Sequence, residues 1–404
     1  MRTTDVRILE TAVTFRDVLL DHPLRLAGAT VDRFTLALVT AVVEDRRGRV
    51  AEGTGAGVLS VPWSWPRSPL SWEARDAEMR AQTSRFAAAA VSGDAADPLD
   101  HADALAGLRL VPGSMPDLAV SLAMAGVDNA VHDAWARAAG RPAAELYTTL
   151  TPSLPRTRLP VQHVVGVGDP LEPGDNREPL VSLREWVDLE GIAHVKVKLP
   201  ARDPREDAAR VADVHRVLTA GAITPTSLSL DPNEAYESPA AVTAMLETLR
   251  RTAPDAYAAV AYLEQPVPRD APPDPAGMRE LARHVPVLAD EGVATQKDLA
   301  TLEEHGWSGL VVKAAKGQSF ALRSHAHARA HGLRVVLQDL TAVDLALAHS
   351  ARLAATLDLD WPAFEYNSRQ YAPRANRDLA ATRPELVTVR NGHVIVGEPQ
   401  PGLY

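Results

Sequence analysis

The strongest constraint on the fold is an alternation of two kinds of segment from residue 161 onward. Short apolar runs alternate with amphipathic segments rich in alanine and arginine. Short apolar runs are typical of buried strands, whereas the longer segments have helical spacing. The pattern predicts strands at VQHVVGV (161–167), HVKVKL (194–199), SLSLD (227–231), AAVAYLE (258–264), VPVLAD (285–290), GLVVK (309–313), RVVLQD (334–339) and PAFEY (362–366). Seven helices are expected between them, the last six at 205–220, 238–252, 274–284, 296–305, 318–331 and 341–356.

Repeated strand–helix units predict parallel strands, because each parallel pair needs a long crossover connection. Eight such units favour a closed (β/α)7β barrel of the TIM type. An open doubly wound sheet is the alternative, but it usually carries a glycine-rich phosphate loop after its first strand, and none follows residues 161–167. We therefore predict an α/β chain with a TIM barrel over residues 156–372.

Residues 1–155 have a different pattern. Segments 5–17, 34–44 and 50–58 are rich in Val, Thr, Ile and Leu and are predicted strands, whereas 71–92 and 116–140 have helical spacing. Strands followed by helices indicate a separate α+β domain. The proline-containing stretch 151–160 is predicted to be a linker.

Composition excludes several classes of function. The net charge of −10 and the absence of a basic stripe argue against nucleic acid and anionic membranes as partners. The chain has no cysteine, so it has neither disulfides nor thiolate nucleophiles. The N-terminus lacks a signal-like apolar run. We expect a cytoplasmic protein.

Five of the predicted strands end in a side chain that catalysis can use, namely Lys198, Asp231, Glu264, Asp290 and Lys313. The intervals between them are 33, 33, 26 and 23 residues, each about one strand–helix unit. All five should therefore lie at the C-terminal end of the barrel, where TIM-barrel active sites are found.

Three carboxylates on consecutive strands repel one another unless a cation lies between them. An all-oxygen site formed by Asp231, Glu264 and Asp290 would prefer Mg²⁺, or Mn²⁺. Lys198 and Lys313 flank this trio and should face each other across it. Lys196 points to the same side as Lys198, and one ammonium beside another eases the loss of a proton from either.

Lysine use supports a role for these positions. Only five of the 42 basic residues are lysine, and four of them lie in HVKVK and VVKAAK. Arginine cannot act as a base in a protein, whereas lysine can. A divalent metal with opposed lysines suits removal of the proton next to a substrate carboxylate, with the metal stabilising the resulting enolate.

The motifs KVK, DPN, EQP, ADE and VVK, in this order, resemble the enolase superfamily, and most of all its muconate-lactonizing-enzyme subgroup. The resemblance implies a capping domain at 1–155 completed by residues 373–404, a barrel at 156–372, and a homo-oligomer. It also implies Mg²⁺ ligands Asp231, Glu264 and Asp290, acid/base lysines Lys198 and Lys313, and Lys196 tuning Lys198. Further residues around the metal or substrate would be Asn233, Gln265, Glu291, Asp339, Glu365, Trp63 and His22.

Some positions depart from that family's pattern. AAKGQS follows the sixth-strand lysine where a Gly-Gly pair is usual. The seventh strand ends at Gln338-Asp339, where the mandelate-racemase branch has a histidine, yet Glu365 resembles that branch's eighth-strand glutamate. Asp358 and Asp360 resemble an ammonium-binding Asp-x-Asp, but they precede the predicted strand, which favours a solvated loop.

The capping loops are expected at 20–26 and 53–66. His22 and Arg25 then either contact substrate or lie in a surface loop, and the surface loop is favoured for each residue singly. Trp63 and Trp65 either line the pocket or pack in the core. The Gly53–Gly57 stretch precedes no helix, which argues against a phosphate loop. His327 and His331 have zinc-compatible spacing, but without a carboxylate partner they are predicted to be surface histidines.

We predict an enolase-superfamily isomerase that abstracts the proton next to the carboxylate of a small substrate, as a racemase or epimerase of an amino-acid or dipeptide-like acid. Cycloisomerisation and syn-dehydration use the same residues and remain alternatives. Outside the superfamily, a Schiff-base aldolase using Lys313 or a non-catalytic binding protein is possible, but either leaves the three carboxylates unexplained.

Overall fold

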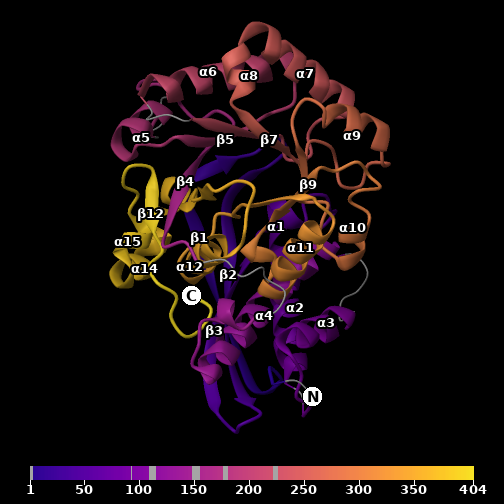
Figure 1. Cartoon of the computed structure of the whole chain (residues 1–404), viewed down its shortest axis with the longest axis vertical. Coiled ribbons are helices and arrows are strands. Elements are labelled where there is room, and N and C mark those ends of the chain that lie inside the picture. The colour runs from indigo at the N-terminus through magenta and orange to yellow at the C-terminus, as the bar shows by residue number, and fades with distance from the viewer. Residues whose placement is uncertain (1–2, 92, 109–114, 148–154, 176–180, 222–225) are drawn as a thin grey trace.

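A computed structural model describes residues 3–91, 93–108, 115–147, 155–175, 181–221 and 226–404. The N-terminal part, drawn in indigo and purple, forms one end of the molecule in Figure 1. The barrel, with α5 to α9 at its outer end, forms the other, and the two parts are in direct contact through α4, α11 and α12.

The N-terminal part is a three-stranded antiparallel sheet, ordered β1-β2-β3, with helices packed against it. A core cluster containing Val39, Phe86 and Val127 lies between the sheet and the helices. The elements are β1 (Val6–Arg25), β2 (Thr30–Asp45), β3 (Val50–Leu59), α1 (Val61–Ser64), α2 (Trp72–Ala90), α3 (Pro98–Gly107), α4 (Asp117–Ala139) and η1 (Ala143–Glu145).

Close contact between β3 and α4 explains the glycines of β3. A Cβ on Gly53 would lie 2.1 Å from the Ala134 backbone nitrogen, and one on Gly55 would lie 2.2 Å from the Gly126 carbonyl oxygen. Only glycine therefore lets the helix approach this strand. The segment is a packed strand and not a phosphate loop.

The barrel follows as alternating strands and helices. Its elements are β4 (Arg158–Val165), α5 (Leu183–Glu190), β5 (His194–Lys198), α6 (Pro204–Gly221), β6 (Ser227–Asp231), α7 (Pro239–Thr252), α8 (Pro254–Ala258), β7 (Val260–Glu264), α9 (Pro275–Leu281), β8 (Val287–Ala289), α10 (Gln296–Ala300), β9 (Gly309–Val312), η2 (Ala314–Lys316), α11 (Gln318–Ala330), β10 (Arg334–Leu337), α12 (Leu345–Thr356) and β11 (Phe364–Glu365).

The eight barrel strands are parallel and run in the order β10-β9-β8-β7-β6-β5-β4-β11. The two strands at the ends of this order, β10 and β11, are consecutive in the chain. The segment before β11 bonds to β10, because the Asp360 backbone nitrogen donates to the Val335 carbonyl at 2.8 Å. The sheet is therefore barrel-like, as the alternating pattern predicted.

Alternation along each strand separates the helix-facing core from the barrel interior. On β5, Val195 and Val197 join the main apolar cluster, whereas Lys196 and Lys198 face inward. An interior apolar cluster fills the N-terminal end of the barrel, formed by Tyr262, Leu288, Val311, Val336, Trp361 and Ala363. The polar interior residues therefore lie at the C-terminal end of the barrel, next to this apolar cluster.

The C-terminal segment contacts both parts of the molecule. Its elements are α13 (Ser368–Tyr371), η3 (Pro373–Asn376), α14 (Arg377–Thr382), α15 (Pro384–Val387) and β12 (His393–Ile395). Strand β12 pairs with β4 of the barrel, whereas the Leu403 nitrogen donates to Asp133 and the Tyr404 hydroxyl donates to the Thr54 carbonyl of the N-terminal part. The domain limits at 155 and 372 remain a prediction.

Three sequence predictions need correction. Residues 20–25 belong to β1 and Gly53–Leu59 to β3, so much of both predicted capping loops is strand. The pairing of β1 with β2 breaks after Leu19 and resumes at Leu24, and β3 pairs with β2 as far as Leu59. The predicted linker 151–160 lies partly outside the described residues (151–154), and β4 already begins at Arg158. The predicted helix 296–305 ends at Ala300.

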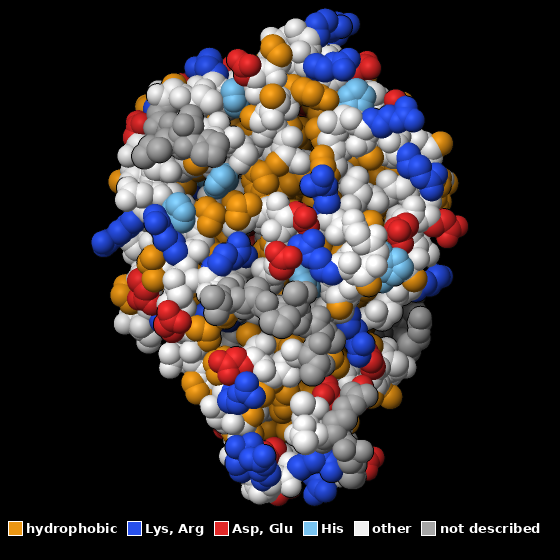
Figure 2. Space-filling model, viewed as in Figure 1, with side chains coloured by type: hydrophobic (Ala, Val, Ile, Leu, Met, Phe, Trp, Pro, Cys, Tyr) orange, Lys and Arg blue, Asp and Glu red, His pale blue; other side chains and the backbone are white. Residues whose placement is uncertain are grey.

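The surface fits the composition. On the face in Figure 2, acidic and basic side chains are interspersed and no basic stripe appears. Within the described part of the chain, no helix combines the length and apolar character needed to cross a bilayer.

The glycine contacts lead to a stability prediction. Gly55→Ala should lower the free energy of unfolding by about 2 kcal/mol or more, because the new methyl meets helix backbone and overpacking costs typically about 1–3 kcal/mol. Urea denaturation measures the change. Gly28→Ala is the control, since its Cβ meets nothing within 4 Å, and it should change stability by less than about 0.5 kcal/mol. Equal changes in the free energy of unfolding in the two variants would show that contact with α4 is not what requires glycine at position 55.

Candidate active site

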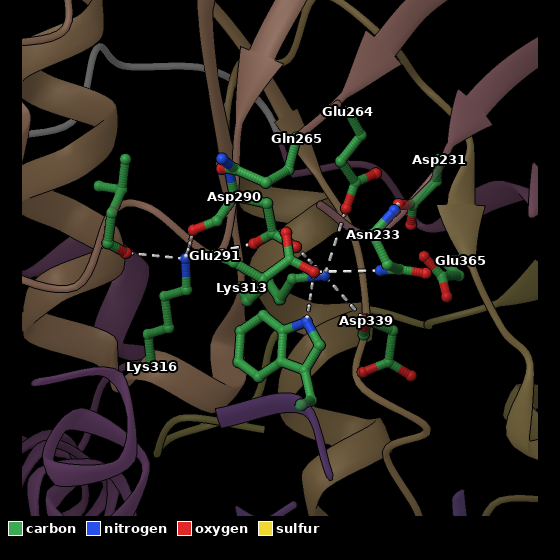
Figure 3. Close-up of polar contacts among 12 residues, drawn as sticks. Asp231, Asn233, Glu264, Gln265, Asp290, Glu291, Lys313, Lys316, Asp339 and Glu365 are labelled. Carbon is green, nitrogen blue, oxygen red and sulfur yellow. Dashed lines mark hydrogen bonds and ion pairs between the residues drawn. The ribbon is translucent and has the colours of Figure 1, made fainter. Parts of the chain in front are cut away.

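Polar side chains from successive barrel strands converge at the C-terminal end of the barrel (Figure 3). Asp231 and Glu264 are the last residues of β6 and β7, and Asp290 directly follows β8. Lys198 ends β5 and Lys313 directly follows β9. The five predicted side chains therefore share one end of the sheet, and all five are buried.

The two predicted acid/base lysines lie on opposite sides of the barrel. Strands β6, β7 and β8 lie between β5 and β9, so these two strands are four positions apart among the eight barrel strands. Lys198 pairs in register with Asp231 and donates a hydrogen bond to its carboxylate. A substrate between the lysines would meet one ammonium group on each side.

Lys196 is held among carboxylates. Its Nζ lies 2.7 Å from an oxygen of Glu264, 2.7 Å from one of Glu365 and 3.7 Å from one of Asp231. Burial alone would lower the pKa of Lys196, but these carboxylates outweigh it and raise the pKa well above its usual value. The predicted easing of proton loss by a neighbouring lysine is therefore outweighed at Lys196.

Lys313 lies between two of the carboxylates. Its Nζ is 3.0 Å from an oxygen of Asp290 and 3.6 Å from one of Glu264, and it donates to the Asp339 carbonyl at 3.1 Å. Burial opposes the charged form, yet Asp290 and Glu264 raise the pKa of Lys313. The Trp63 ring lies over this ammonium, with its centroid 5.3 Å away, which favours the cation further.

Lys316 is a buried lysine to which the sequence analysis gave no role. Its ammonium donates to the carbonyls of Asp290 (2.6 Å) and Val293 (2.9 Å) and to the Asp290 carboxylate (3.2 Å), as Figure 3 shows. Burial lowers the pKa of Lys316. The low lysine content was the signal that this position matters, but only the fold reveals its partner.

Glu291 and Asn233 join the neighbouring strand ends to the N-terminal part. Glu291 Oε1 accepts hydrogen bonds from the Trp63 indole (2.9 Å) and the Asn233 amide (3.0 Å). The Asn233 backbone nitrogen donates to Asp231 at 2.9 Å. Burial, with repulsion from Asp290 and Asp231, raises the pKa of Glu291 to about 7. Trp63 thereby links the N-terminal part to the site.

Gln265 fixes the backbone around Asp290. Its side-chain oxygen accepts from the backbone nitrogens of Asp290 (2.9 Å) and Gly292 (3.1 Å), and its amide donates to the Val267 carbonyl at 3.1 Å. All three bonds join backbone groups near the strand ends. Gln265 therefore holds the backbone on either side of Asp290, and its predicted place around a metal stays a prediction.

The carboxyl oxygens fit a hard divalent cation. Both oxygens of Glu264, Asp290 Oδ2 and Glu291 Oε2 are buried without a hydrogen bond of good geometry, although Glu264 Oε2 and Asp290 Oδ2 form ion pairs with Lys196 and Lys313. Such oxygens are the donors that Mg²⁺ and Mn²⁺ prefer. Burial and repulsion from Asp231 raise the pKa of Glu264 to about 8, against the opposing effect of Lys196. A cation would relieve this repulsion.

The charge balance agrees with this fit. Six carboxyl groups face four amino groups here, so the acids carry two more charges than the bases when all ten groups are ionised; the acids are Asp231, Glu264, Asp290, Glu291, Asp339 and Glu365 and the bases Lys196, Lys198, Lys313 and Lys316. Within the described ranges, no three His, Asp or Glu side chains already stand in a coordination geometry. Lysine ammonium groups lie among the carboxylates instead.

A small cavity, of about 30 Å³, opens at this end of the barrel. The barrel contributes Lys196, Lys198, Asp231, Asn233, Lys313, Asp339, Leu340, Thr341, Glu365 and Asn367, and the N-terminal part contributes Leu24, Leu26, Val31, Phe34, Ser60 and Trp63. None of these N-terminal residues is charged, so the cavity is ionic on its barrel side and largely apolar on the other.

Asp339 and Glu365 lie at the edge of this cavity. Glu365 accepts from the Asn367 amide at 3.0 Å and pairs with Lys196. Asp339 accepts from the Ala342 backbone nitrogen at 3.0 Å. Burial, with repulsion from Glu365, raises the pKa of Asp339 to about 7. Both predicted substrate-side residues are thus brought to the site.

Other predicted positions lie elsewhere. His22, near the end of β1, does not line the cavity, whereas Leu24 and Leu26 do. Trp65 packs in an apolar cluster with Met79. Asp360 pairs with Arg329 at 3.0 Å, at the opposite end of the barrel, so the Asp-x-Asp pair is not part of the site.

The predicted surface histidines do have a carboxylate neighbour. His331 Nδ1 lies 2.6 Å from Glu303, and the rings of His327 and His331 stack with centroids 4.3 Å apart. His331 and Glu303 are exposed, with 45% and 55% of their side-chain surface accessible. The group lies on the outside of α11, away from the cavity.

Comparisons with known proteins agree with this architecture. A family model described as enolase C-terminal domain-like matches residues 180–403. The chain is 27% identical over 315 residues to muconate cycloisomerase 1 of Rhodococcus opacus (76% of this chain, 72% of that one). It is 27% identical over 239 residues to the L-Ala-D/L-Glu epimerase of Bacillus subtilis (strain 168), covering 58% of this chain but only 59% of the epimerase. The structure of 2-chloromuconate cycloisomerase from Rhodococcus opacus 1CP matches 98% of this chain and 95% of its own, with a TM-score of 0.70 and 24% identity.

The buried carboxyl of Asp339 gives a pH prediction. Its pKa is about 7 in the folded chain against an ordinary value of 3.8, so it favours folding fully below pH 4, and this contribution is lost as pH rises through 7. Asp339→Asn cannot ionise. Its stability relative to wild type should therefore rise between pH 4 and 7, by on the order of a few kcal/mol, and level off above that.

Denaturation at several pH values measures this difference. Asp378→Asn is the control, because that carboxyl is 85% exposed and has similar surroundings in the folded and unfolded chain. If the difference in unfolding free energy between Asp339→Asn and wild type does not change with pH, burial does not raise the pKa of Asp339.

Proposed function

Because the chain belongs to the enolase C-terminal domain-like family, we propose that it is a racemase or epimerase that moves the proton on the carbon next to a substrate carboxylate. The observation that carries this proposal is the placement of Lys198 and Lys313 on opposite sides of one cavity. Racemisation removes a proton from one face of a carbon and returns one to the other, so it needs a proton-carrying group on each face.

The two lysines have complementary roles in the proposed reaction. Lys198 takes the proton from one enantiomer while Lys313 donates to the opposite face, and the reverse reaction exchanges their roles. Lys196 stays charged among Glu264 and Glu365 and contributes a fixed positive charge beside Lys198. Trp63 shields the Lys313 side from water, since its ring covers that ammonium.

The metal ligands of the proposal are Asp231, Glu264 and Asp290, with Asn233, Gln265 and Glu291 holding them in place. Mg²⁺ bound there, or Mn²⁺, supplies positive charge that stabilises the enolate form of the substrate carboxylate and compensates the buried acids. Lys198 and Lys313, which pair with Asp231 and Asp290, are the groups that accept and return the proton.

The cavity indicates the class of substrate. The ionic barrel side suits a carboxylate, and the carboxyl groups of Asp339 and Glu365 suit an amino or amide group. Leu24, Leu26 and Phe34 suit an apolar side chain. We infer an amino-acid or dipeptide-like acid with an apolar substituent. Among the described residues that line the N-terminal side of the cavity, none is a cation that could pair with a second carboxylate.

Cycloisomerisation is the second candidate, because the relatives include muconate cycloisomerase 1. It needs one lysine as a base or acid, while the other acts only through its charge. Exchange experiments on both faces of a substrate separate the two reactions.

Metal binding provides the first test. Isothermal titration should detect about one Mg²⁺ per chain, and Asp231→Asn, Glu264→Gln and Asp290→Asn should each weaken it at least ~100-fold, more than the loss of a supporting residue around a metal usually costs. Asp133→Asn, a buried carboxyl of α4, is the matched control and should keep the affinity. A ligand variant with wild-type affinity removes that residue from the site.

Face-specific exchange provides the second test. In D₂O with Mg²⁺, a panel of free, N-acetylated and alanine-linked L- and D-leucine and phenylalanine should contain substrates whose α-proton exchanges. Lys198→Ala should slow exchange from one enantiomer by at least ~100-fold and leave part of the exchange from the other, and Lys313→Ala should show the reverse preference. NMR or mass spectrometry measures the incorporated deuterium.

Lys→Arg at either position separates charge from proton transfer. Arginine keeps the charge but cannot accept a proton near pH 7, so it should behave like alanine. Full activity of Lys313→Arg, or equal loss from both enantiomers in both alanine variants, would favour cycloisomerisation. Activity that resists EDTA and is trapped by borohydride with substrate would instead indicate a Schiff-base enzyme.

A further inference from the structure

Lys313 is followed at once by a segment that the N-terminal part holds from outside the barrel. Residues Ala314–Lys316 form η2, and α11 begins at Gln318. Gly317, at the N-cap of α11, has φ +97° and no side chain to cap the helix. The first backbone N–H groups of a helix need acceptors from elsewhere.

Helix α4 supplies those acceptors. Asp128 accepts from the Ser319 backbone nitrogen (2.8 Å) and hydroxyl (2.6 Å), and Asn129 accepts from the Gln318 nitrogen at 3.0 Å. Ser121, also on α4, donates to the Lys316 carbonyl at 3.2 Å. Four hydrogen bonds therefore tie residues 316–319 to one helix of the other part of the molecule.

These contacts are buried and closely fitted. Asp128 and Asn129 are 3% and 0% exposed. A Cβ on Gly317 would lie 2.8 Å from the Asp128 carboxylate, so no larger residue fits between them. His132 adds a contact of 2.8 Å to the Ser319 hydroxyl, one turn further along α4. The carboxylate also lies at the positive end of the α11 dipole, which favours this position for a negative charge.

Helix α4 is itself fixed to β3. The Asn129 amide donates to the Ala56 carbonyl at 3.0 Å while its oxygen serves α11, so one side chain joins both elements. Strand β3 continues into the segment that carries Trp63, whose indole reaches Glu291. The cavity wall and the Lys313 segment are thus connected through a single helix.

For Lys198, no such hydrogen bond to the N-terminal part is found among the described residues. It ends β5, bonds to Asp231, and Leu199 continues with a backbone bond to the Asp231 carbonyl, all within the barrel. The two lysines therefore differ in what holds them: barrel strands alone hold Lys198, whereas α4 also supports the segment after Lys313.

From this asymmetry we propose that Asp128 and Asn129 are positioning residues for Lys313, so that the N-terminal part sets the geometry of one of the two proton-transfer faces. This rests on the proposed function of Lys313 in proton transfer. Loss of Asp128 should misplace Lys313 and leave Lys198 in place. The effect is then selective for one face and not a general loss of activity.

The test compares two buried aspartates of α4. Asp128→Ala leaves the start of α11 without its acceptor, whereas Asp133→Ala removes acceptors for Thr54, Arg137 and Leu403 and does not touch α11. Both variants should lose stability. Only Asp128→Ala should shift the ratio of deuterium exchange between the two enantiomers, by about 10- to 100-fold against the Lys313 face, since small misplacements cost this much.

If Asp128→Ala does not fold, Asp128→Asn replaces it in the test. The asparagine oxygen can still accept from the Ser319 nitrogen, but the asparagine NH₂ group cannot accept from the Ser319 hydroxyl. This variant should shift the ratio in the same direction, by less. An unchanged ratio in every Asp128 variant, or an equal shift in Asp133→Ala, overturns the inference.

Hydrogen–deuterium exchange of the backbone separates this inference from the proposed function. Amides of residues 313–319 should lose protection in the Asp128 variants and keep it in Asp133→Ala. Absence of substrate exchange in the wild type would refute the proposed function. The backbone measurement would still decide whether α4 holds the segment, and unchanged protection there would overturn the positioning role.

Discussion

The structure depends on the compensation of negative charges that parallel strands bring together. Parallel strands in a barrel place their C-terminal residues at one end, so Asp231, Glu264 and Asp290 are forced close to one another in a buried site. Buried carboxylates are costly unless cations pair with them. Four buried lysines provide part of the compensation, and the remaining negative charge is what makes the site suited to a divalent cation.

The same pairing shapes the chemistry. A lysine that neutralises a carboxylate is held as an ammonium, and the pKa of both Lys196 and Lys313 is raised by their carboxylate neighbours. A base must give up that proton. The neighbouring acids therefore stabilise Lys313 as a cation, whereas the proposed proton transfer requires it to act as a base in one direction.

The N-terminal part contributes more than a cover for the cavity. Its glycine-lined strand β3 admits α4 at backbone contact, and α4 caps the helix that follows Lys313. Trp63 extends from the same part to Glu291 and over the Lys313 ammonium. The barrel alone thus leaves one side of the site incompletely supported, which gives a physical reason for the close packing of the two parts.

The sequence by itself determined the barrel, the five strand-end residues and their common location, because alternation of apolar runs and helices is a local property and strand ends follow from it. It also indicated Asn233, Gln265, Glu291 and Glu365 through the motifs around them. Only the tertiary structure decided that Lys196 faces Glu264 and Glu365 and that Leu24, not His22, lines the cavity. It also decided that Lys316 reaches Asp290 and that Asp128 caps the start of α11. These contacts join residues from 26 to more than 190 positions apart, and no local pattern fixes which of many polar side chains will meet across such separations.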